Sequence, residues 1–144
     1  MRKKETFNRH QKLAFKVLEY IQKYIDTDIN IEHLSNELEV DRFHLQKIFK
    51  EQFYTNIYQT IKSIRLQKAS NLLLTNVRST ITEIANQCGY SSQTSFITAF
   101  KMKFNQTPTS WRQGGYIEYS NAIFQTSNID LNQKFDYSKL ESKI

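Results

Sequence analysis

The 144-residue sequence is poor in the residues on which many catalytic and metal sites depend, with one cysteine, three histidines, three glycines and one proline. Cys88 alone excludes an internal disulfide and a cysteine-based zinc site, and the histidines do not fall at HExxH spacing. Three glycines exclude a GxGxxG or Walker phosphate loop. No nucleophile–base pair is apparent, so an enzyme is the weakest interpretation, and no catalytic residue, metal or cofactor is predicted.

Long apolar runs are also missing from the sequence. No run approaches the roughly 18 residues of a membrane span, and no signal-peptide core follows the charged start. Glycine and proline, which interrupt helices, are scarce. We therefore expect an all-α protein of the cytoplasm, without membrane contact.

Positive charge is abundant, and it lies in the middle of the chain. The formal net charge is +6, and residues 42–112 hold ten basic and two acidic side chains. Residues 1–41 and 113–144 each have a net charge of −1. A basic centre between near-neutral ends is typical of a protein that binds a polyanion, although a solvated lysine face gives the same composition.

Apolar periodicity and helix-capping residues predict seven helices. They cover about residues 10–25, 31–38, 42–52, 56–75, 80–88 and 92–103, and a short last helix begins at residue 108. Thr80 and Glu83 have the spacing of a capping box, in which each side chain binds the other residue's backbone amide. Pro108 after Thr107 suits the first position of a helix, where its missing N–H costs nothing.

The chain contains a duplicated unit. The pattern Phe-Lys-x-x-Phe occurs at residues 49–53 and again 51 residues later, at 100–104. The apolar positions before it, Leu34, Leu38 and Val40, recur 50 residues later as Ile84, Cys88 and Tyr90. Two short helices joined by a tight turn, present twice in a basic chain, indicate two helix-turn-helix units. The long helix between them is about 30 Å long, close to the ~34 Å between successive major-groove segments on one face of DNA. We assign residues 8–55 to the first subdomain, 56–76 to a linker helix, 77–112 to the second subdomain and 113–144 to a C-terminal extension.

A longer signature lies in the second unit and after it. It reads RSTITEIA over residues 78–85, CGYSSQ over 88–93 and TPTSWR over 107–112, with Phe43-His44 in the first unit. These residues resemble the AraC/XylS family of bacterial transcription regulators. The resemblance covers about residues 10–112. It implies a seven-helix fold with two helix-turn-helix subdomains, operator binding, and control of transcription through contact with RNA polymerase.

The resemblance also shows departures. The CGYSSQ form is similar to a subgroup whose DNA-binding half precedes a gyrase-inhibitor-like effector domain. The 32 residues after Arg112 are too few for that domain, which predicts a truncated or incomplete protein whose last residues approach the missing part. The family usually has glycine at the positions of Glu39, Tyr54 and Asn105; asparagine tolerates a positive φ, whereas the other two put their turns in question.

Candidate base contacts come from the outward faces of the two predicted recognition helices. Glutamine pairs with adenine, lysine reaches guanine, and an aromatic ring touches thymine methyl groups. The resemblance places such contacts at Phe43, Gln46 and Lys47, although Phe43 has the alternative role of covering the core. The full candidate set is Arg42, Phe43, Gln46, Lys47 and Lys50 in the first helix, and Ser92, Gln93, Thr94, Ser95, Thr98 and Lys101 in the second.

The two helices are expected to contribute unequally. Family members often carry arginine at the position of Thr98, so the resemblance predicts a weaker, more water-mediated contact in the second unit. We hypothesise that the first unit sets most of the base specificity. Asn56, Gln59 and Lys62, at the start of the linker helix, are candidates for phosphate contacts.

Two further residues are expected to be structural. The resemblance implies an ion-pair role for Arg65 rather than a DNA contact. Cys88 occupies the position of Leu38 in the first unit, which favours a buried apolar role.

The sequence thus predicts a sequence-specific regulator that binds a double-stranded DNA operator at the nucleoid, as a monomer or weak homodimer. A nonspecific nucleic-acid binder and a helical protein-interaction module are the alternatives.

Overall fold

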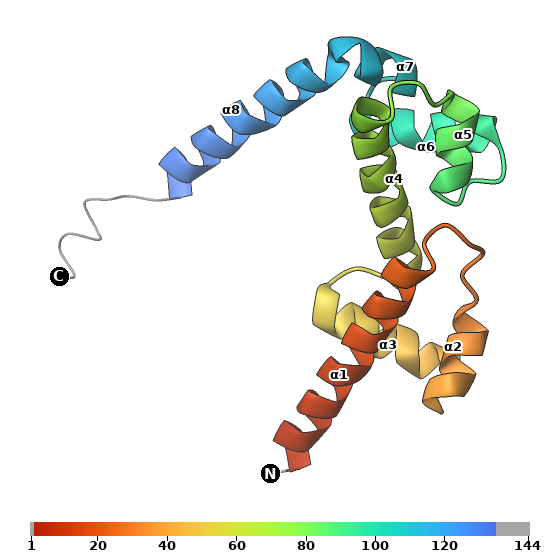
Figure 1. The fold of residues 1–144 in the computed structure, drawn as a ribbon. Helices are drawn as coiled ribbons and strands as arrows, with labels where there is room; N and C mark the ends of the chain where they lie inside the picture. Colours follow the sequence, from red (N-terminus) through yellow and green to blue (C-terminus); the bar gives the residue numbers. More distant parts are fainter. Residues whose placement is uncertain (1, 135–144) are drawn as a thin grey trace.

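The computed structural model describes residues 2–134, and the side chains of residues 3–125; within that range it is helical and contains no strand. The elements are α1 (Arg2–Lys23), α2 (Ile31–Leu38), α3 (Arg42–Phe53), α4 (Ile57–Thr75), α5 (Ile81–Gln87), α6 (Gln93–Phe104), α7 (Pro108–Ser110), the π-helical turn η1 (Trp111–Gly115) and α8 (Tyr116–Lys134). Figure 1 shows α1, α2 and α3 at one end of α4, and α5, α6 and α7 at its other end. The all-α prediction is confirmed.

All seven predicted helices are present, with one substantial difference in length. Helix α1 begins at Arg2 rather than near residue 10, ahead of the predicted boundary at residue 8. Its first turns consist mainly of lysine, arginine and glutamate, which favour helix without needing an apolar face. It ends at Lys23 rather than at Ile25.

The helix starts follow the capping rules. Asn30, Asp41, Asn56, Thr80, Ser92 and Thr107 each accept a hydrogen bond from a backbone amide of the following turn. The capping box is complete: Glu83 N donates to Thr80 Oγ1 at 3.1 Å, and Thr80 N donates to Glu83 Oε2 at 3.3 Å. Side-chain oxygens thus satisfy amides that a helix start leaves unpaired.

The three turns at which the family usually has glycine adopt the left-handed conformation. Glu39 has a φ of 56°, and Tyr54 and Asn105 each have a φ of 58°. Each residue ends a helix, and its backbone N–H bonds back to that helix. The turn geometry is therefore kept, at a cost of about 1–2 kcal/mol for Glu39 and for Tyr54 and a smaller cost for Asn105, because asparagine tolerates this conformation.

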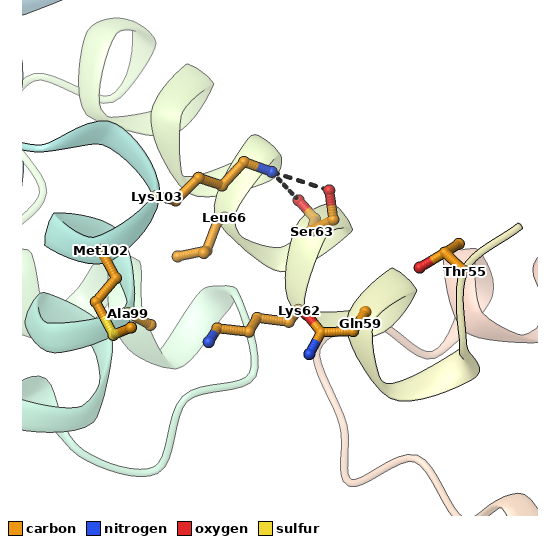
Figure 2. Close-up of a pocket in the computed structure, with 8 residues that line it drawn as sticks. All are labelled: Thr55, Gln59, Lys62, Ser63, Leu66, Ala99, Met102 and Lys103. Carbon is orange, nitrogen blue, oxygen red and sulfur yellow. Dashed lines mark hydrogen bonds between the residues drawn. The ribbon is translucent and has the colours of Figure 1, made fainter.

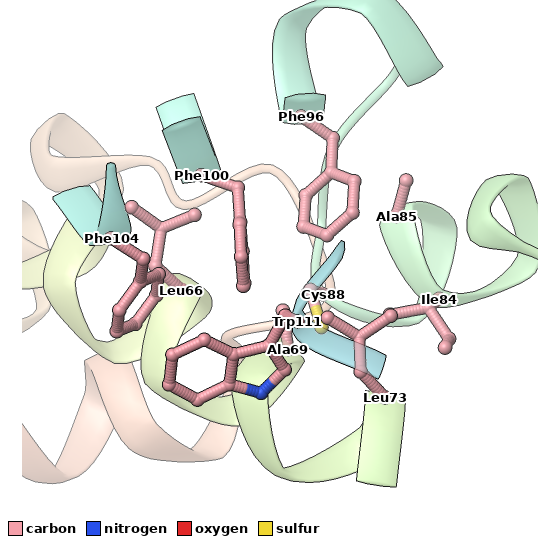
Figure 3. Packing of buried hydrophobic residues seen from close by; sticks show 10 residues of the cluster. All are labelled: Leu66, Ala69, Leu73, Ile84, Ala85, Cys88, Phe96, Phe100, Phe104 and Trp111. Atoms are coloured by element: carbon pink, nitrogen blue, oxygen red, sulfur yellow. The ribbon is translucent and has the colours of Figure 1, made fainter. Parts of the chain in front are cut away.

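Each unit has its own apolar core. The first core is formed by α1, α3 and the surrounding elements, and its buried members are Val17, Ile21, Ile25, Leu34, Leu45, Phe49 and Ile57. The second is built on the other half of α4. Its buried members are Leu66, Ala69, Leu73, Ile84, Ala85, Cys88, Phe96, Phe100, Phe104 and Trp111 (Figure 3). Because α4 contributes to both cores, it joins the two units.

Trp111 and Arg112 fasten the second unit to the end of α4. The indole N–H of the buried Trp111 donates to Ser70 O at 3.0 Å. Arg112 donates to the carbonyl oxygens of Leu73, Ser79 and Asn76 at 3.0, 2.7 and 3.0 Å. These bonds satisfy carbonyl groups at and beyond the last turn of α4, where the helix offers no partner.

Helix α8 is an addition to the seven-helix prediction. Its first turns pack on the second core through Tyr119, whose ring lies 5.3 Å from both Phe104 and Trp111. Beyond these turns it extends away from the rest of the molecule (Figure 1), and Phe124 is exposed. The residues from 135 onwards in the predicted extension lie outside the described residues.

Candidate nucleic-acid interface

The first recognition helix presents an open polar face. Asp41 caps α3 by accepting from the amides of Phe43 and His44 at 3.1 and 3.3 Å. The helix buries Leu45, Ile48 and Phe49, which turns the opposite face to solvent. All five predicted contacts of this helix, Arg42, Phe43, Gln46, Lys47 and Lys50, are exposed there.

Phe43 is part of this exposed face. The alternative prediction, that its ring covers the core, is wrong. Its side chain is 67% exposed, and the Arg42 guanidinium lies 4.9 Å from the ring centroid. Gln46 and Lys47 have no hydrogen-bond or ion-pair partner within the described residues. They are therefore available for an external ligand.

The second recognition helix is exposed as well, but more of its polar groups already have partners. The hydroxyl of Thr82 in α5 donates to Gln93 Oε1 at 2.7 Å. Ser92 caps α6 by accepting from Ser95 N at 3.1 Å, and its hydroxyl donates to Ser95 Oγ at 2.8 Å. Among the six predicted contacts of this helix, only Thr94, Thr98 and Lys101 have no such bond within the described residues.

The three predicted phosphate contacts of the linker helix have different surroundings in the structure. Asn56 uses its amide oxygen to cap α4, accepting from Gln59 N at 2.7 Å. Gln59 and Lys62 instead line a cavity of about 430 Å³ between α4 and α6, in which Figure 2 shows the Lys62 side chain extended towards α6. Its other lining residues are Thr55, Ser63, Leu66, Ala99, Met102 and Lys103.

A neighbouring cavity, also of about 430 Å³, brings Lys62 together with the second recognition helix. Thr94, Ser95 and Thr98 line it from α6, and Tyr58 and Lys62 line it from α4. Tyr58, whose side chain is 71% exposed, is not among the contacts predicted from the sequence. Its position four residues before Lys62 places both on one helix face, and that spacing was the signal available.

Lys103 closes the far side of the first cavity. Its ammonium donates to Ser63 Oγ at 2.9 Å, as drawn in Figure 2. Burial lowers the pKa of Lys103 below its ordinary value, because the charged form loses water.

Arg65 is structural, as expected, but the predicted ion pair is wrong. Its guanidinium donates to the backbone oxygens of Ile25 and Thr27 at 3.1 and 2.8 Å. The described residues give it no carboxylate partner. The carbonyl groups of the turn after α1 take the place of an acidic side chain.

Cys88 is buried, in agreement with its apolar assignment. Burial raises the pKa of its thiol to about 11, although the nearby charges of Lys68 and Arg65 act in the opposite direction. A protonated thiol is a poor nucleophile, so the geometry does not favour redox chemistry at this position. Among the described residues, no group of three or more potential ligands is placed to hold a metal ion, and no helix is long and apolar enough to cross a membrane.

Comparison with known proteins shows which family has this arrangement. A family model described as a helix-turn-helix domain matches residues 34–114. Regulatory protein SoxS of Salmonella typhimurium is 30% identical over 103 residues, covering 72% of this chain and 95% of SoxS. The chain belongs to the AraC/XylS family of transcription regulators.

Some relatives in the family are much longer than this chain. The xylose operon regulatory protein of Escherichia coli is 31% identical over 99 residues, which cover 69% of this chain and 25% of that protein. The chain thus spans about a quarter of the length of this curated relative.

Solved structures agree with the family assignment. A probable AraC family transcriptional regulator from Rhodopseudomonas palustris has a TM-score of 0.64 and 27% identity, covering 72% of this chain and 97% of that one. The C-terminal domain of AraT, a response regulator from Geobacillus stearothermophilus, has a TM-score of 0.66 and 30% identity, covering 70% and 84% of the two chains. The matched proteins are regulators, a non-enzymatic class, and the chain carries the family's DNA-binding domain.

Proposed function

We propose that the chain reads a bipartite operator in double-stranded DNA, with α3 and α6 in successive major-groove segments. The observation that carries this proposal is the presence of two exposed recognition helices on one linker helix. Helix α4 has 19 residues and is therefore about 28 Å long, close to the ~34 Å repeat of a DNA face. One chain thus suffices for two-site binding, so a monomer or a weak homodimer is enough.

Electrostatics supports DNA as the partner. Arg42, Lys47 and Lys50 are exposed on α3 and Lys101 on α6, while Lys62 lies between the linker and α6. Cations at these places would neutralise phosphates along the duplex and make binding dependent on salt. We propose that the chain regulates transcription in the cytoplasm, at the nucleoid, with RNA polymerase as a further partner.

We propose further that α3 supplies most of the base discrimination. A glutamine recognises adenine with both its oxygen and its amide group. Gln46 has both groups free, whereas the oxygen of Gln93 is held by Thr82. The bond from Thr82 fixes the orientation of the Gln93 amide, so turning that amide towards a base edge costs this bond and reduces its net contribution.

The test is selection of bound duplexes from a random library at about 0.15 M salt, where nonspecific binding is already weakened. We expect two short motifs whose centres lie about 10 base pairs apart. Binding of duplexes without enrichment of any sequence motif would support a nonspecific nucleic-acid binder. Absence of retention would support a protein-interaction module instead.

Matched variants assign the motifs to the helices. Gln46→Ala is expected to weaken the base preference within one motif, whereas Gln93→Ala should leave most of the base preference within the other motif unchanged. If Gln93→Ala erased sequence preference and Gln46→Ala did not, the proposed division between the helices would be wrong.

A further inference from the structure

Three segments that are far apart in the sequence meet at the carbonyl oxygen of Ile25, in the turn after α1. Arg65 of α4 donates from Nε to this oxygen at 3.1 Å and from Nη2 to Thr27 O at 2.8 Å. Gly89, in the turn of the second unit, lies against the same atoms. We call Ile25, Thr27, Arg65 and Gly89 the inter-unit junction.

Gly89 shows how tight the inter-unit junction is. A Cβ built at this position would lie 2.6 Å from Ile25 O and 2.8 Å from Arg65 Nε. Gly89 also has a φ of +86°, a conformation that residues with a side chain rarely adopt. The backbone of the second unit therefore touches the first unit directly, at a place where only glycine fits.

Arg65 is suited to hold this contact in one orientation. Its guanidinium is planar, and two donors in a fixed fork bind two carbonyl groups of the same turn. A single flexible bond would allow rotation about the contact, whereas two bonds from one rigid group resist it. The angle between the units thus depends on the junction as well as on α4, because a long helix by itself bends gently.

The angle between the units has a consequence for DNA. Each base pair inserted between two half-sites rotates one relative to the other by about 34° and moves it by about 3.4 Å. Two linked modules reinforce each other only when the geometry lets both bind at once. We propose that the inter-unit junction sets the spacing and rotational phase of the half-sites that the protein accepts. This inference rests on the proposed two-site binding of duplex DNA.

Lys68 provides a matched control for Arg65. It lies on α4 one turn later and donates from Nζ to Gln87 O at 2.9 Å, so it makes the same kind of bond. That bond stays within the second unit, because the adjacent α4 residues Leu66 and Ala69 already belong to the second core. Replacing Lys68 removes one positive charge and one carbonyl partner but breaks no hydrogen bond between the two units.

The experiment measures the affinity of the full chain for the selected operator and for versions with one base pair removed, one added and two added. The proteins are the wild type, Arg65→Met, Arg65→Lys and Lys68→Met, each with its thermal unfolding curve. Adding two base pairs should weaken wild-type binding by about tenfold or more, because the half-sites rotate by about 70°. Arg65→Met should reduce this penalty to about threefold or less, Arg65→Lys should be intermediate, and Lys68→Met should keep the wild-type penalty.

Two results would overturn the proposal: a folded Arg65→Met protein with the wild-type spacing penalty, or a wild type that binds all spacings equally well. If Arg65→Met does not fold, the test rests on Arg65→Lys. An Arg65→Lys protein with the same spacing penalty as the wild type would show that the junction does not set the half-site spacing. Failure of the wild type to select any paired motif would instead reject the proposed function. The two failures are therefore distinguishable.

Discussion

The turns of the two helix-turn-helix units share a backbone conformation but not a reason for it. Glu39 in the first unit and Gly89 in the second both have a positive φ, of 56° and 86°. Glu39 is exposed and has room for its side chain, whereas Gly89 lies against Ile25 O and Arg65. The turn is therefore exposed to solvent in the first unit and packed against other residues in the second.

The recognition helices differ in the same direction. Gln46 in the first unit has no partner within the described residues, but Gln93 in the second is bound to Thr82. One unit has kept its polar groups available, and the other has used several of them for its own structure. The two units thus share a fold but differ in how many polar groups of the recognition helix are free for an external partner.

The largest expected contrast concerns the turns. Gly89→Ala should lower the free energy of unfolding by roughly 2–4 kcal/mol, because it adds left-handed strain and a clash with Ile25 O. Glu39→Ala, at the matching position, should change it by less than about 0.5 kcal/mol, since both residues carry a Cβ and the site is exposed. Urea denaturation of the three proteins measures both values. Equal stability of Gly89→Ala and the wild type would show that the second turn is not packed as described.

The next contrast concerns base reading. Gln46→Ala should reduce discrimination at one base pair of the operator by about 1–3 kcal/mol, because it removes a two-bond contact to adenine. Gln93→Ala should cost less than about 1 kcal/mol, because part of its hydrogen-bonding capacity is already used. Competition binding with single-base-pair variants measures each loss. Similar losses for the two variants would remove the distinction between the helices.

Most of the fold follows from local signals that the sequence displays. Capping residues such as Thr80 mark the helix starts, and the repeated Phe-Lys-x-x-Phe pattern reveals the duplication. The predicted contact residues are indeed exposed, because the apolar period fixes which face of each helix is buried. Their contacts with DNA remain predictions.

What the sequence did not reveal depends on contacts between distant segments. The carbonyl partners of Arg65 lie in a turn 38–40 residues away, and no residue type signals a backbone oxygen. The bond from Thr82 to Gln93 crosses between two helices. Helix α8 has no strong amphipathic pattern, and its position follows from Tyr119 packing on Trp111.

A smaller contrast compares the ends of the recognition helices. Tyr54→Gly should raise the free energy of unfolding by about 0.5–1 kcal/mol, because relief of left-handed strain exceeds the added chain entropy of glycine. Asn105→Gly should have an effect close to zero, since asparagine tolerates this conformation. Thermal unfolding compares the two variants with the wild type. A stabilisation by Asn105→Gly larger than that by Tyr54→Gly would contradict this explanation.

The smallest contrast comes from Cys88, which replaces Leu38 of the first unit. Burial raises the pKa of its thiol from 9.0 to about 11, so the unfolded chain loses this proton at lower pH than the folded one. As the pH rises from about 8 to about 9, stability should therefore decline by only a few tenths of a kcal/mol. Urea denaturation across this range, with Cys88→Ala as the reference, isolates the contribution. An identical pH dependence in both proteins would show that the thiol does not contribute.

We propose that α3 of the first unit discriminates between bases more strongly than α6 of the second. The most direct test is the affinity of the wild-type chain for every single-base-pair variant of the selected operator. We expect the larger penalties, about 1–3 kcal/mol per base pair, in the half-site whose motif changes in Gln46→Ala. Larger penalties in the half-site assigned to α6 would contradict the account.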